Sequence, residues 1–326
     1  MKPRHALILM TLLVAVLALS CATERLGSRP ALRHVKVLID WKAEPTYAGF
    51  YLARERGLYR KRGLDVEIVE GTGATVSAQV IGAGTAYFIG SSSAEATAIA
   101  RSRGIPVRSV AVFYPDVPTV VYSRADTPIR HPRDLPGKRI GLNKGSITYD
   151  EYRGLLAAND IDRGRITEVA TGFDAAPLLS RQVDGLLDYQ ELTPTELKAD
   201  GHALVLMRLA DFGLKAYSLN LIVNDAALER EQAAIRAITE ATIEGYELLR
   251  KNPAEAAALF SRVFPARNKA YVLESMTIVA RLLGEPVGRQ TRRGWERTIA
   301  TLESLDLLAR KVTVDEVTVK EYVATP

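Results

Sequence analysis

Apolar and polar residues near the start of the chain alternate in a way that predicts two strands with a helix between them. Residues 35–39 alternate with a period of two, which is typical of a half-buried strand. From Tyr47 onward apolar and aromatic residues recur at helical spacing, and Gly57 can take the left-handed conformation that ends a helix. The alternation returns over residues 64–68. We therefore expect two parallel strands joined by a right-handed helical crossover.

The rest of the chain continues this alternation of strands and helices and then becomes mainly helical. The expected elements are strands at 86–90, 107–113, 119–123, 185–187 and 217–223, and helices at 94–103, 227–251, 254–263, 270–283 and 292–305.

Two crossings between two α/β series divide the predicted molecule into two lobes. Lobe I is expected to comprise residues 35–120 and 221–326, and lobe II residues 121–220. The predicted fold class is therefore α/β, with two lobes, a hinge and a ligand cleft between the lobes, because such hinges close around a ligand.

Polar and aromatic residues gather where the first predicted strand ends. Asp40 and Trp41 follow that strand directly, and Tyr47 lies in the loop or at the start of the helix. Open α/β sheets bind ligands at this position, and an exposed flat ring there suits stacking on a heteroaromatic ligand. A tryptophan in the core or between the lobes is the alternative.

Two later strand ends lead into helices that begin with hydroxyl residues. Ser91 and Ser92 follow one of these strands, and Ser146 and Tyr149 follow the other. Their hydroxyls and the free N–H groups of the helix starts could hold a polar or anionic group. Ordinary capping is the alternative, because Ser92 and Thr148 each have a glutamate three residues later.

Acidic and aromatic residues follow the predicted strand at 185–187. Asp188, Tyr189 and Glu191 are candidates, because carboxylates accept hydrogen bonds from amino or ring N–H groups and oppose sulfonate or nitrate. The alternative is that Glu191 lies in the first turn of the following helix, where its negative charge interacts favourably with the helix dipole. Tyr114 and Tyr217 lie near the two predicted crossings and complete the candidates.

The opening segment resembles the signature of bacterial periplasmic binding proteins for thiamine pyrimidine precursors, which feed ABC importers. The segment 134–141 resembles the start of the second lobe of these proteins. The resemblance implies a type II periplasmic-binding-protein fold and a monomer that passes a small molecule to an ABC permease and its ATPase. Riboflavin-, sulfonate- and nitrate-binding proteins belong to the same superfamily. The matching opening residues are Asp40-Trp41, Pro45, Gly49, Tyr51, Ala53, Gly57, Tyr59 and Gly63-Leu64-Asp65-Val66.

The N-terminus has the pattern of an export signal. Two basic residues precede an apolar run over residues 6–19, and the run ends just before Cys21, the only cysteine. The placement of Cys21 resembles a bacterial lipobox, which implies acylation and an anchor on the outer face of a cell membrane. We therefore expect a lipoprotein signal over residues 1–21 and a tether over residues 22–34. An incidental thiol is the alternative.

Charge and motifs exclude several other classes of protein. The chain has 43 Lys and Arg residues against 38 Asp and Glu residues, evenly scattered, and no zinc-finger or RNP motif, so we expect no nucleic-acid binding. The four histidines are isolated, which argues against a metal site. No Walker A or G-x-G-x-x-G motif is present, and we expect no bound cofactor.

The leading interpretation is a lipid-anchored solute-binding protein for a thiamine pyrimidine precursor. Riboflavin, sulfonate and nitrate remain as other ligands within the class, and an extracytoplasmic sensor remains as another use of the same module. The resemblance also includes enzymes that make the thiamine pyrimidine from an internal histidine and lysine-bound pyridoxal phosphate. No histidine lies in the opening loop and the sole cysteine lies in the signal, so we expect no enzyme.

Overall fold

The computed structural model describes residues 31–324, apart from the side chain of Val323. The predicted signal, Cys21 and most of the predicted tether lie outside these residues. The tether prediction extends too far, because β1 (Arg33–Ile39) already includes His34. His34 is fixed by its ring nitrogen Nε2, which lies 3.2 Å from Oε2 of Glu67 on the neighbouring strand.

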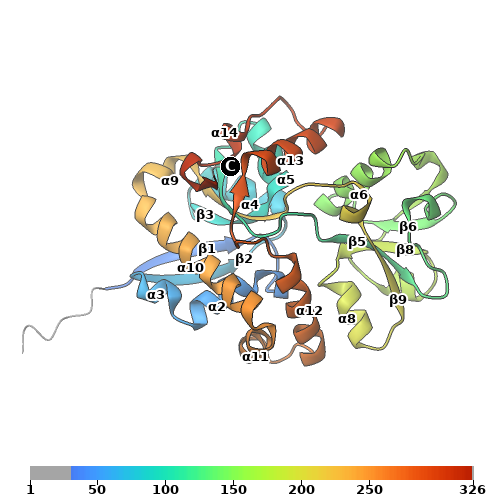
Figure 1. Ribbon diagram of the computed structural model, residues 1–326, viewed down its shortest axis with the longest axis horizontal. Helices are drawn as coiled ribbons and strands as arrows, with labels where there is room; N and C mark the ends of the chain where they lie inside the picture. The colour runs from blue at the N-terminus through green and yellow to red at the C-terminus, as the bar shows by residue number, and fades with distance from the viewer. Residues whose placement is uncertain (1–30, 325–326) are drawn as a thin grey trace, which may run out of the picture. The chain divides into compact units, whose positions relative to one another are not determined.

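The first of two five-stranded sheets has the strand order β2-β1-β3-β10-β4. Its strands β1, β2 and β3 are labelled in Figure 1. β1 and β3 run parallel, with Leu38 opposite Gly90, whereas β10 is antiparallel to both of its neighbours. This sheet and the helices packed on it are called lobe I below. Its other strands are β2 (Leu64–Glu70), β3 (Ile89–Ser93), β4 (Val107–Val112) and β10 (Leu219–Asn224).

The period of two in β1 directs its side chains to two different cores. Val37 and Ile39 belong to the core that includes α2 (Ala48–Glu55) and α10 (Gln232–Lys251). Leu38 belongs to a separate cluster with α4 (Ala74–Ala83). Helices therefore cover both faces of the sheet, as in other open α/β sheets.

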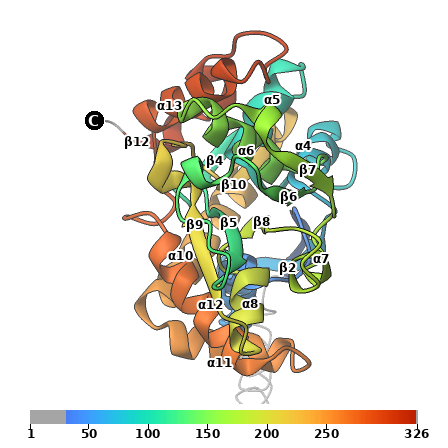
Figure 2. The same cartoon turned by 90° about the vertical axis from the view of Figure 1, so that its right-hand side faces the viewer.

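The second sheet has the order β7-β6-β8-β5-β9 and is seen on the near side in Figure 2. β6 runs parallel to β7 and β8, whereas β5 is antiparallel to β8 and β9. This sheet and its helices are called lobe II. The strands are β5 (Thr119–Arg124), β6 (Arg139–Leu142), β7 (Thr167–Ala170), β8 (Gly185–Tyr189) and β9 (Leu204–Arg208), and the helices are α6 (Ile147–Ala158), α7 (Ala176–Leu179) and α8 (Thr193–Ala199).

The chain passes between the sheets twice, once after β4 and once before β10. β5 lies entirely in the second sheet and β10 entirely in the first, so the boundaries predicted at 120/121 and 220/221 fall inside these two strands. β10 inserts between β3 and β4, and its return completes lobe I.

Between residues 31 and 324, none of the helices is both long and apolar enough to span a membrane.

The remaining elements lie mostly in the C-terminal third of the chain. These elements are α3 (Leu58–Lys61), α5 (Ala94–Ser102), α9 (Asp225–Arg230), α11 (Pro253–Val263), α12 (Lys269–Leu282), α13 (Arg292–Ser304), α14 (Val314–Val317), β11 (Gln290–Thr291), β12 (Val323–Ala324) and the 3₁₀ turns η1 (Pro45–Tyr47), η2 (Pro132–Asp134), η3 (Arg163–Arg165), η4 (Leu209–Phe212) and η5 (Lys320–Tyr322).

Two local predictions were wrong. The strand expected at 86–90 is β3, which begins later and includes the serines, and Ser93 rather than Ser92 caps α5 by accepting a hydrogen bond from the N–H of Ala96 at 3.1 Å. The single helix expected at 227–251 is two helices, α9 and α10, which meet at Glu231.

Candidate ligand-binding site

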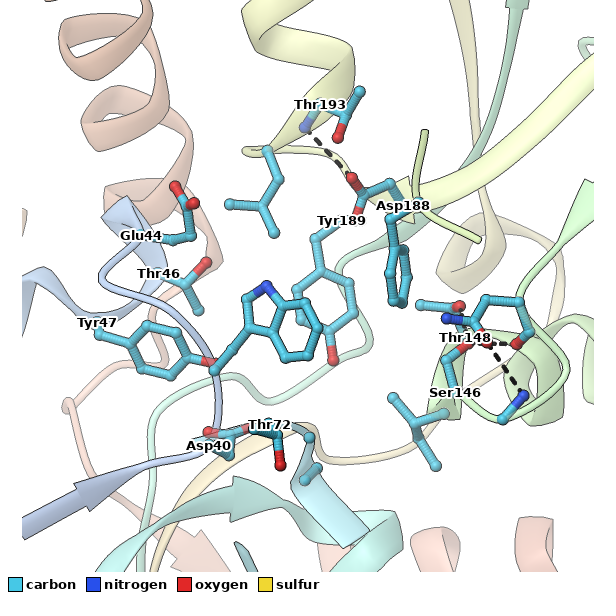
Figure 3. A pocket seen from close by; sticks show the side chains of 18 of the residues that line it. Asp40, Glu44, Thr46, Tyr47, Thr72, Ser146, Thr148, Asp188, Tyr189 and Thr193 are labelled. Carbon is cyan, nitrogen blue, oxygen red and sulfur yellow. Dashed lines mark hydrogen bonds between the residues drawn. The ribbon is translucent and has the colours of Figure 1, made fainter. Parts of the chain in front are cut away.

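A cavity of about 310 Å³ lies between the two lobes, at the carboxyl ends of β1 and β8 (Figure 3). Lobe I contributes Asp40, Trp41 and Tyr47, and lobe II contributes Asp188 and Tyr189. The helix starts at Gly73–Val76 and Gly145–Thr148 also line the cavity. The walls therefore combine aromatic rings with carboxyl and backbone polar groups.

Asp40 is held in the lobe I wall by Ser91 of β3. The Ser91 hydroxyl donates to Oδ1 of Asp40 and accepts a hydrogen bond from the Asp40 backbone N–H at 2.8 Å. Burial raises the pKa of Asp40, and the hydrogen bond from Ser91 opposes this. Ser91 is fully buried and does not line the cavity, so its role is to position Asp40.

Asp188 occupies the equivalent position at the end of β8. Its carboxylate accepts hydrogen bonds from the backbone N–H groups of Tyr189 at 2.7 Å and Thr193 at 3.3 Å (Figure 3). Burial raises its pKa to about 6, while these hydrogen bonds oppose the rise. At neutral pH the group is therefore mainly an ionised hydrogen-bond acceptor.

The cavity is lined by four carboxyl side chains and, among the described residues, by no lysine, arginine or histidine. The carboxyl groups belong to Asp40, Glu44, Asp188 and Glu196. Of these four, Glu44 pairs with a cation, and its partner is Arg267, whose Nη1 lies 2.7 Å away. Such a lining favours a ligand that donates hydrogen bonds or carries positive charge, and opposes an anion.

Helices α4 and α6 begin at the cavity, one from each lobe. Neither has a side-chain cap. The N–H groups that begin a helix have no partner four residues earlier within it, although in α6 the Tyr149 N–H donates to the Ser146 carbonyl oxygen at 3.2 Å. The capping box predicted from Thr148 and Glu151 does not form. Ser146 is the N-cap residue, and its hydroxyl lies 2.7 Å from both the Asn143 carbonyl oxygen and the Thr148 hydroxyl.

The sequence candidates divide into residues that line the cavity and residues that do not. The lining residues are Asp40, Trp41, Tyr47, Ser146, Asp188 and Tyr189, and the others are Ser91, Ser92, Tyr114, Tyr149, Glu191 and Tyr217.

Glu191 and Tyr114 lie together in the contact between the lobes rather than in the cavity wall. Oε1 of the fully buried Glu191 accepts hydrogen bonds from the hydroxyls of Thr46 at 3.0 Å and Tyr114 at 3.3 Å. Burial raises the pKa of Glu191 to about 7. The alternative role in the first turn of α8 is also wrong, because α8 begins later, at Thr193.

Ser92, Tyr149 and Tyr217, the other three candidates outside the cavity wall, have their partners elsewhere in the structure. Ser92 donates to the Ala74 carbonyl oxygen at 3.0 Å, and the Tyr149 hydroxyl accepts a hydrogen bond from Arg163. Tyr217 packs edge-on against Trp295, with ring centroids 5.8 Å apart. Residue type alone could not separate these side chains from the lining ones.

Sequence reasoning missed Glu44, Phe173, Glu196 and Tyr271, which line the cavity. Phe173 could have been found by the rule that selected Trp41, that ligand sites lie where strands end, because it comes shortly after the strand β7. Tyr271 and Glu196 lie on helices, so no strand-end signal could find them. In residues 31–324, no group of three or more His, Cys, Asp or Glu side chains is placed to hold a metal ion.

Known proteins resemble this chain over most of its length. A formylaminopyrimidine-binding protein of Halalkalibacterium halodurans is 28% identical, covering 94% of this chain and 96% of that protein. The riboflavin-binding protein RibY of Chloroflexus aurantiacus is 22% identical, covering 91% and 88%. A 4-amino-5-hydroxymethyl-2-methylpyrimidine phosphate synthase of Schizosaccharomyces pombe is 26% identical, but covers only 64% of this chain and 65% of the enzyme.

Solved structures confirm the predicted fold. The periplasmic aliphatic sulphonate binding protein SsuA of Escherichia coli matches with a TM-score of 0.72 at 16% identity, covering 88% of this chain and 97% of that one. A family model described as NMT1/THI5 like matches residues 44–256, well over half of the sequence. The chain therefore belongs to the NMT1/THI5-like family.

Proposed function

We propose that this protein is an extracytoplasmic solute-binding lipoprotein that captures a thiamine pyrimidine precursor and delivers it to an ABC permease and its ATPase. The observation that carries the proposal is the lining of the cavity, which combines aromatic rings from both lobes with carboxyl groups and lacks cationic side chains. The similarity to a formylaminopyrimidine-binding protein over nearly the whole chain supports the same ligand class.

An aminopyrimidine matches each part of this lining. Its flat ring can stack on Trp41 or Tyr189, since aromatic faces stabilise one another when offset or edge-on. Its amino group can donate to Asp40 or Asp188, whose carboxyl groups are held in place by hydrogen bonds from the Ser91 hydroxyl and from two backbone N–H groups, respectively. The N–H groups at the starts of α4 and α6 can donate to its ring nitrogens or hydroxyl group.

The same lining opposes the anionic ligands of the superfamily. A sulfonate or nitrate would bring negative charge next to four carboxyl groups with no cation in the wall to offset it. Riboflavin is uncharged and aromatic, and it remains the second candidate because RibY is related over most of its length.

The pyrimidine synthase is the alternative from another class. The similarity to the synthase covers less of this chain than the similarity to the formylaminopyrimidine-binding protein does. In addition, no lysine or histidine lines the described cavity. Lys42 follows Trp41 in the sequence, but it is exposed and outside the cavity wall. The lining therefore favours capture over synthesis.

Export, acylation at Cys21 and delivery to a permease complete the proposal and rest on the N-terminal pattern and the fold. Incorporation of labelled palmitate should require Cys21, and Cys21→Ser should release the protein from the membrane fraction. Unchanged membrane association of Cys21→Ser would contradict lipid anchoring.

The ligand can be tested by thermal shift on a chain that begins after Cys21. The panel would contain hydroxymethyl- and formylamino-pyrimidines, thiamine, riboflavin, taurine and nitrate. A ligand present at about a hundred times its Kd adds roughly 2.7 kcal/mol to the free energy of unfolding, which is readily seen as a higher Tm. We expect this with a pyrimidine. A shift with taurine or nitrate alone would overturn the proposed ligand class.

A further inference from the structure

One aromatic contact spans the cleft. Trp41, directly after β1 in lobe I, and Phe173, after β7 in lobe II, both line the cavity. Their ring centroids are 5.7 Å apart and their planes meet at 64°, so the rings pack edge to face. The contact therefore joins the two walls of the cavity.

Phe173 is a large apolar residue that stays partly exposed at the cleft. It is 39% exposed, lines the cavity and has its ring against that of Trp41. The preceding Gly172 has a φ of +63°, a backbone conformation that glycine adopts without strain. The segment is fixed at its ends by the Thr171 N–H donating to the Leu142 carbonyl and by Asp174 accepting from the Ala176 N–H.

The cavity is small, and the Trp41–Phe173 contact bounds it. Its volume of about 310 Å³ lies at the lower end of the roughly 300–1,000 Å³ range of ligand sites. A ring stacked on Trp41 can extend along the indole only until it meets Phe173. The tyrosine rings of the wall, those of Tyr47, Tyr189 and Tyr271, are more buried than Phe173. Phe173 is therefore the ring that can move most easily.

We propose that Phe173 sets the size of the aromatic ring that the cleft accepts, by closing the cleft against Trp41 so that a single ring fits and fused rings are rejected. This deepens the proposed function and rests on it, because it takes the ligand to be a stacked aromatic compound. It separates the two candidate ligands of that function, a one-ring pyrimidine and a three-ring flavin.

Val76 provides the matched control. Its side chain is 44% exposed, is apolar and lines the same cavity, but it comes from α4 of lobe I and makes no ring contact with Trp41. If shortening any apolar side chain at the cleft weakened the selection against fused rings, Val76→Ala would weaken it as well. If the contact of Phe173 with Trp41 causes this selection, only Phe173→Ala will weaken it.

The test is a set of calorimetric titrations on the full chain, purified in detergent, for the wild type, Phe173→Ala and Val76→Ala. The ligands are 4-amino-5-hydroxymethyl-2-methylpyrimidine with one ring, 4-aminoquinazoline with two and riboflavin with three. We expect the wild type to prefer the single ring by about tenfold or more, a discrimination typical of steric fit in a pocket. Phe173→Ala should improve binding of the fused rings by about tenfold and change pyrimidine binding much less. Because Val76 also lines the cavity, Val76→Ala should change the affinities for all three ligands by similar factors and so keep the wild-type ratios between them.

Each other outcome has a definite reading. Equal wild-type affinity for all three ligands, or equal weakening of all three by Phe173→Ala, would overturn the role of Phe173. A wild type that binds 4-aminoquinazoline and riboflavin but not the pyrimidine would overturn both the role of Phe173 and the pyrimidine as ligand. If no aromatic ligand binds, both proposals are wrong.

Discussion

Asp188 is a buried carboxyl group whose partners leave it able to accept a further hydrogen bond. Two backbone N–H groups, from Tyr189 and Thr193, hold it in place. Burial raises its pKa to about 6, so it is mainly ionised at neutral pH. Since the ionised form accepts hydrogen bonds, the affinity for an amino-bearing ligand should fall as the pH drops below about 6.

Asp188→Asn should weaken binding of the pyrimidine by about ten- to a hundredfold, because a hydrogen bond to a charged group contributes about 1.5–3 kcal/mol. Titration calorimetry would measure it, with Asp211→Asn as the control. Asp211 is an exposed aspartate of lobe II, 3.5 Å from Arg208 and outside the cavity. An unchanged Kd for Asp188→Asn would remove Asp188 from the site.

The two tryptophans of the chain should behave in opposite ways. Trp41 is partly buried and lines the cavity, whereas Trp295 is fully buried and donates to Oε1 of Gln290 at 2.9 Å. Trp41→Ala should abolish measurable ligand binding with a small change in Tm. Trp295→Ala should cost about 3–5 kcal/mol of unfolding free energy, the range for deleting a buried aromatic side chain. A loss of stability for Trp41→Ala as large as that for Trp295→Ala would make Trp41 a core residue.

At the scale of elements, α2 and α10 pack at the close approach of two glycines. A Cβ on Gly245 would lie 2.1 Å from the Gly49 carbonyl oxygen, and one on Gly49 would lie 2.2 Å from the ring of Tyr246. Tyr246 in turn donates to the Thr46 carbonyl oxygen at 2.8 Å. The helix contact therefore supports the 3₁₀ turn that carries Tyr47 into the cavity.

Gly245→Ala should destabilise the protein by about 1–3 kcal/mol, the usual cost of overpacking. Alanine is the better helix former by about 1 kcal/mol, but the clash is with backbone, which cannot rotate away. Gly284→Ala is the control, because a Cβ there meets nothing closer than 3.6 Å. Chemical denaturation would compare the two variants, and an equal or higher stability of Gly245→Ala would show that the helices can separate without cost.

At the scale of the whole molecule, two buried glutamates from different lobes face one another. Glu95 lies in α5 and Glu151 in α6, and both are almost completely buried. Burial raises the pKa of each, and for Glu151 the charge of Glu95 adds to the rise. Thr119 donates a hydrogen bond to Glu151, while Asp150 and, on β8, Tyr189 lie near the pair.

The raised pKa values give the pair a defined pH dependence. The folded state binds more protons than the unfolded state, so the stabilisation is complete below about pH 4.3, the usual glutamate value, and is lost as the pH rises through the folded pKa values. Glu95→Gln replaces one of the two titrating carboxyl groups with a neutral amide of similar size. It should raise Tm at about pH 8 and have little effect at about pH 5.

Glu303→Gln, an exposed substitution on α13, provides the control for this comparison. It should leave Tm unchanged at both pH values. Should Glu95→Gln lower Tm equally at both, ionisation of Glu95 is not what lowers the stability at the higher pH.

Particular residues show how far sequence reasoning extends into the site. Asp40, Trp41, Asp188 and Tyr189 could be selected because they directly follow or end strands, and strand ends of open sheets form ligand sites. Ser91 was selected by the same rule, but β3 continues through it and turns it into the support of Asp40. A strand boundary displaced by three residues was enough to change a predicted ligand contact into a buried one.

By itself, the sequence determined the order and type of the main elements, the two α/β series and the polar strand ends, because these depend on local periodicity. Only the tertiary structure decided which of these ends meet. The insertion of β10 between β3 and β4, the contact of Trp41 with Phe173 and the pairing of Glu95 with Glu151 each join segments distant in the chain. Such contacts depend on how the sheets pack, and local hydrophobic patterning does not encode them.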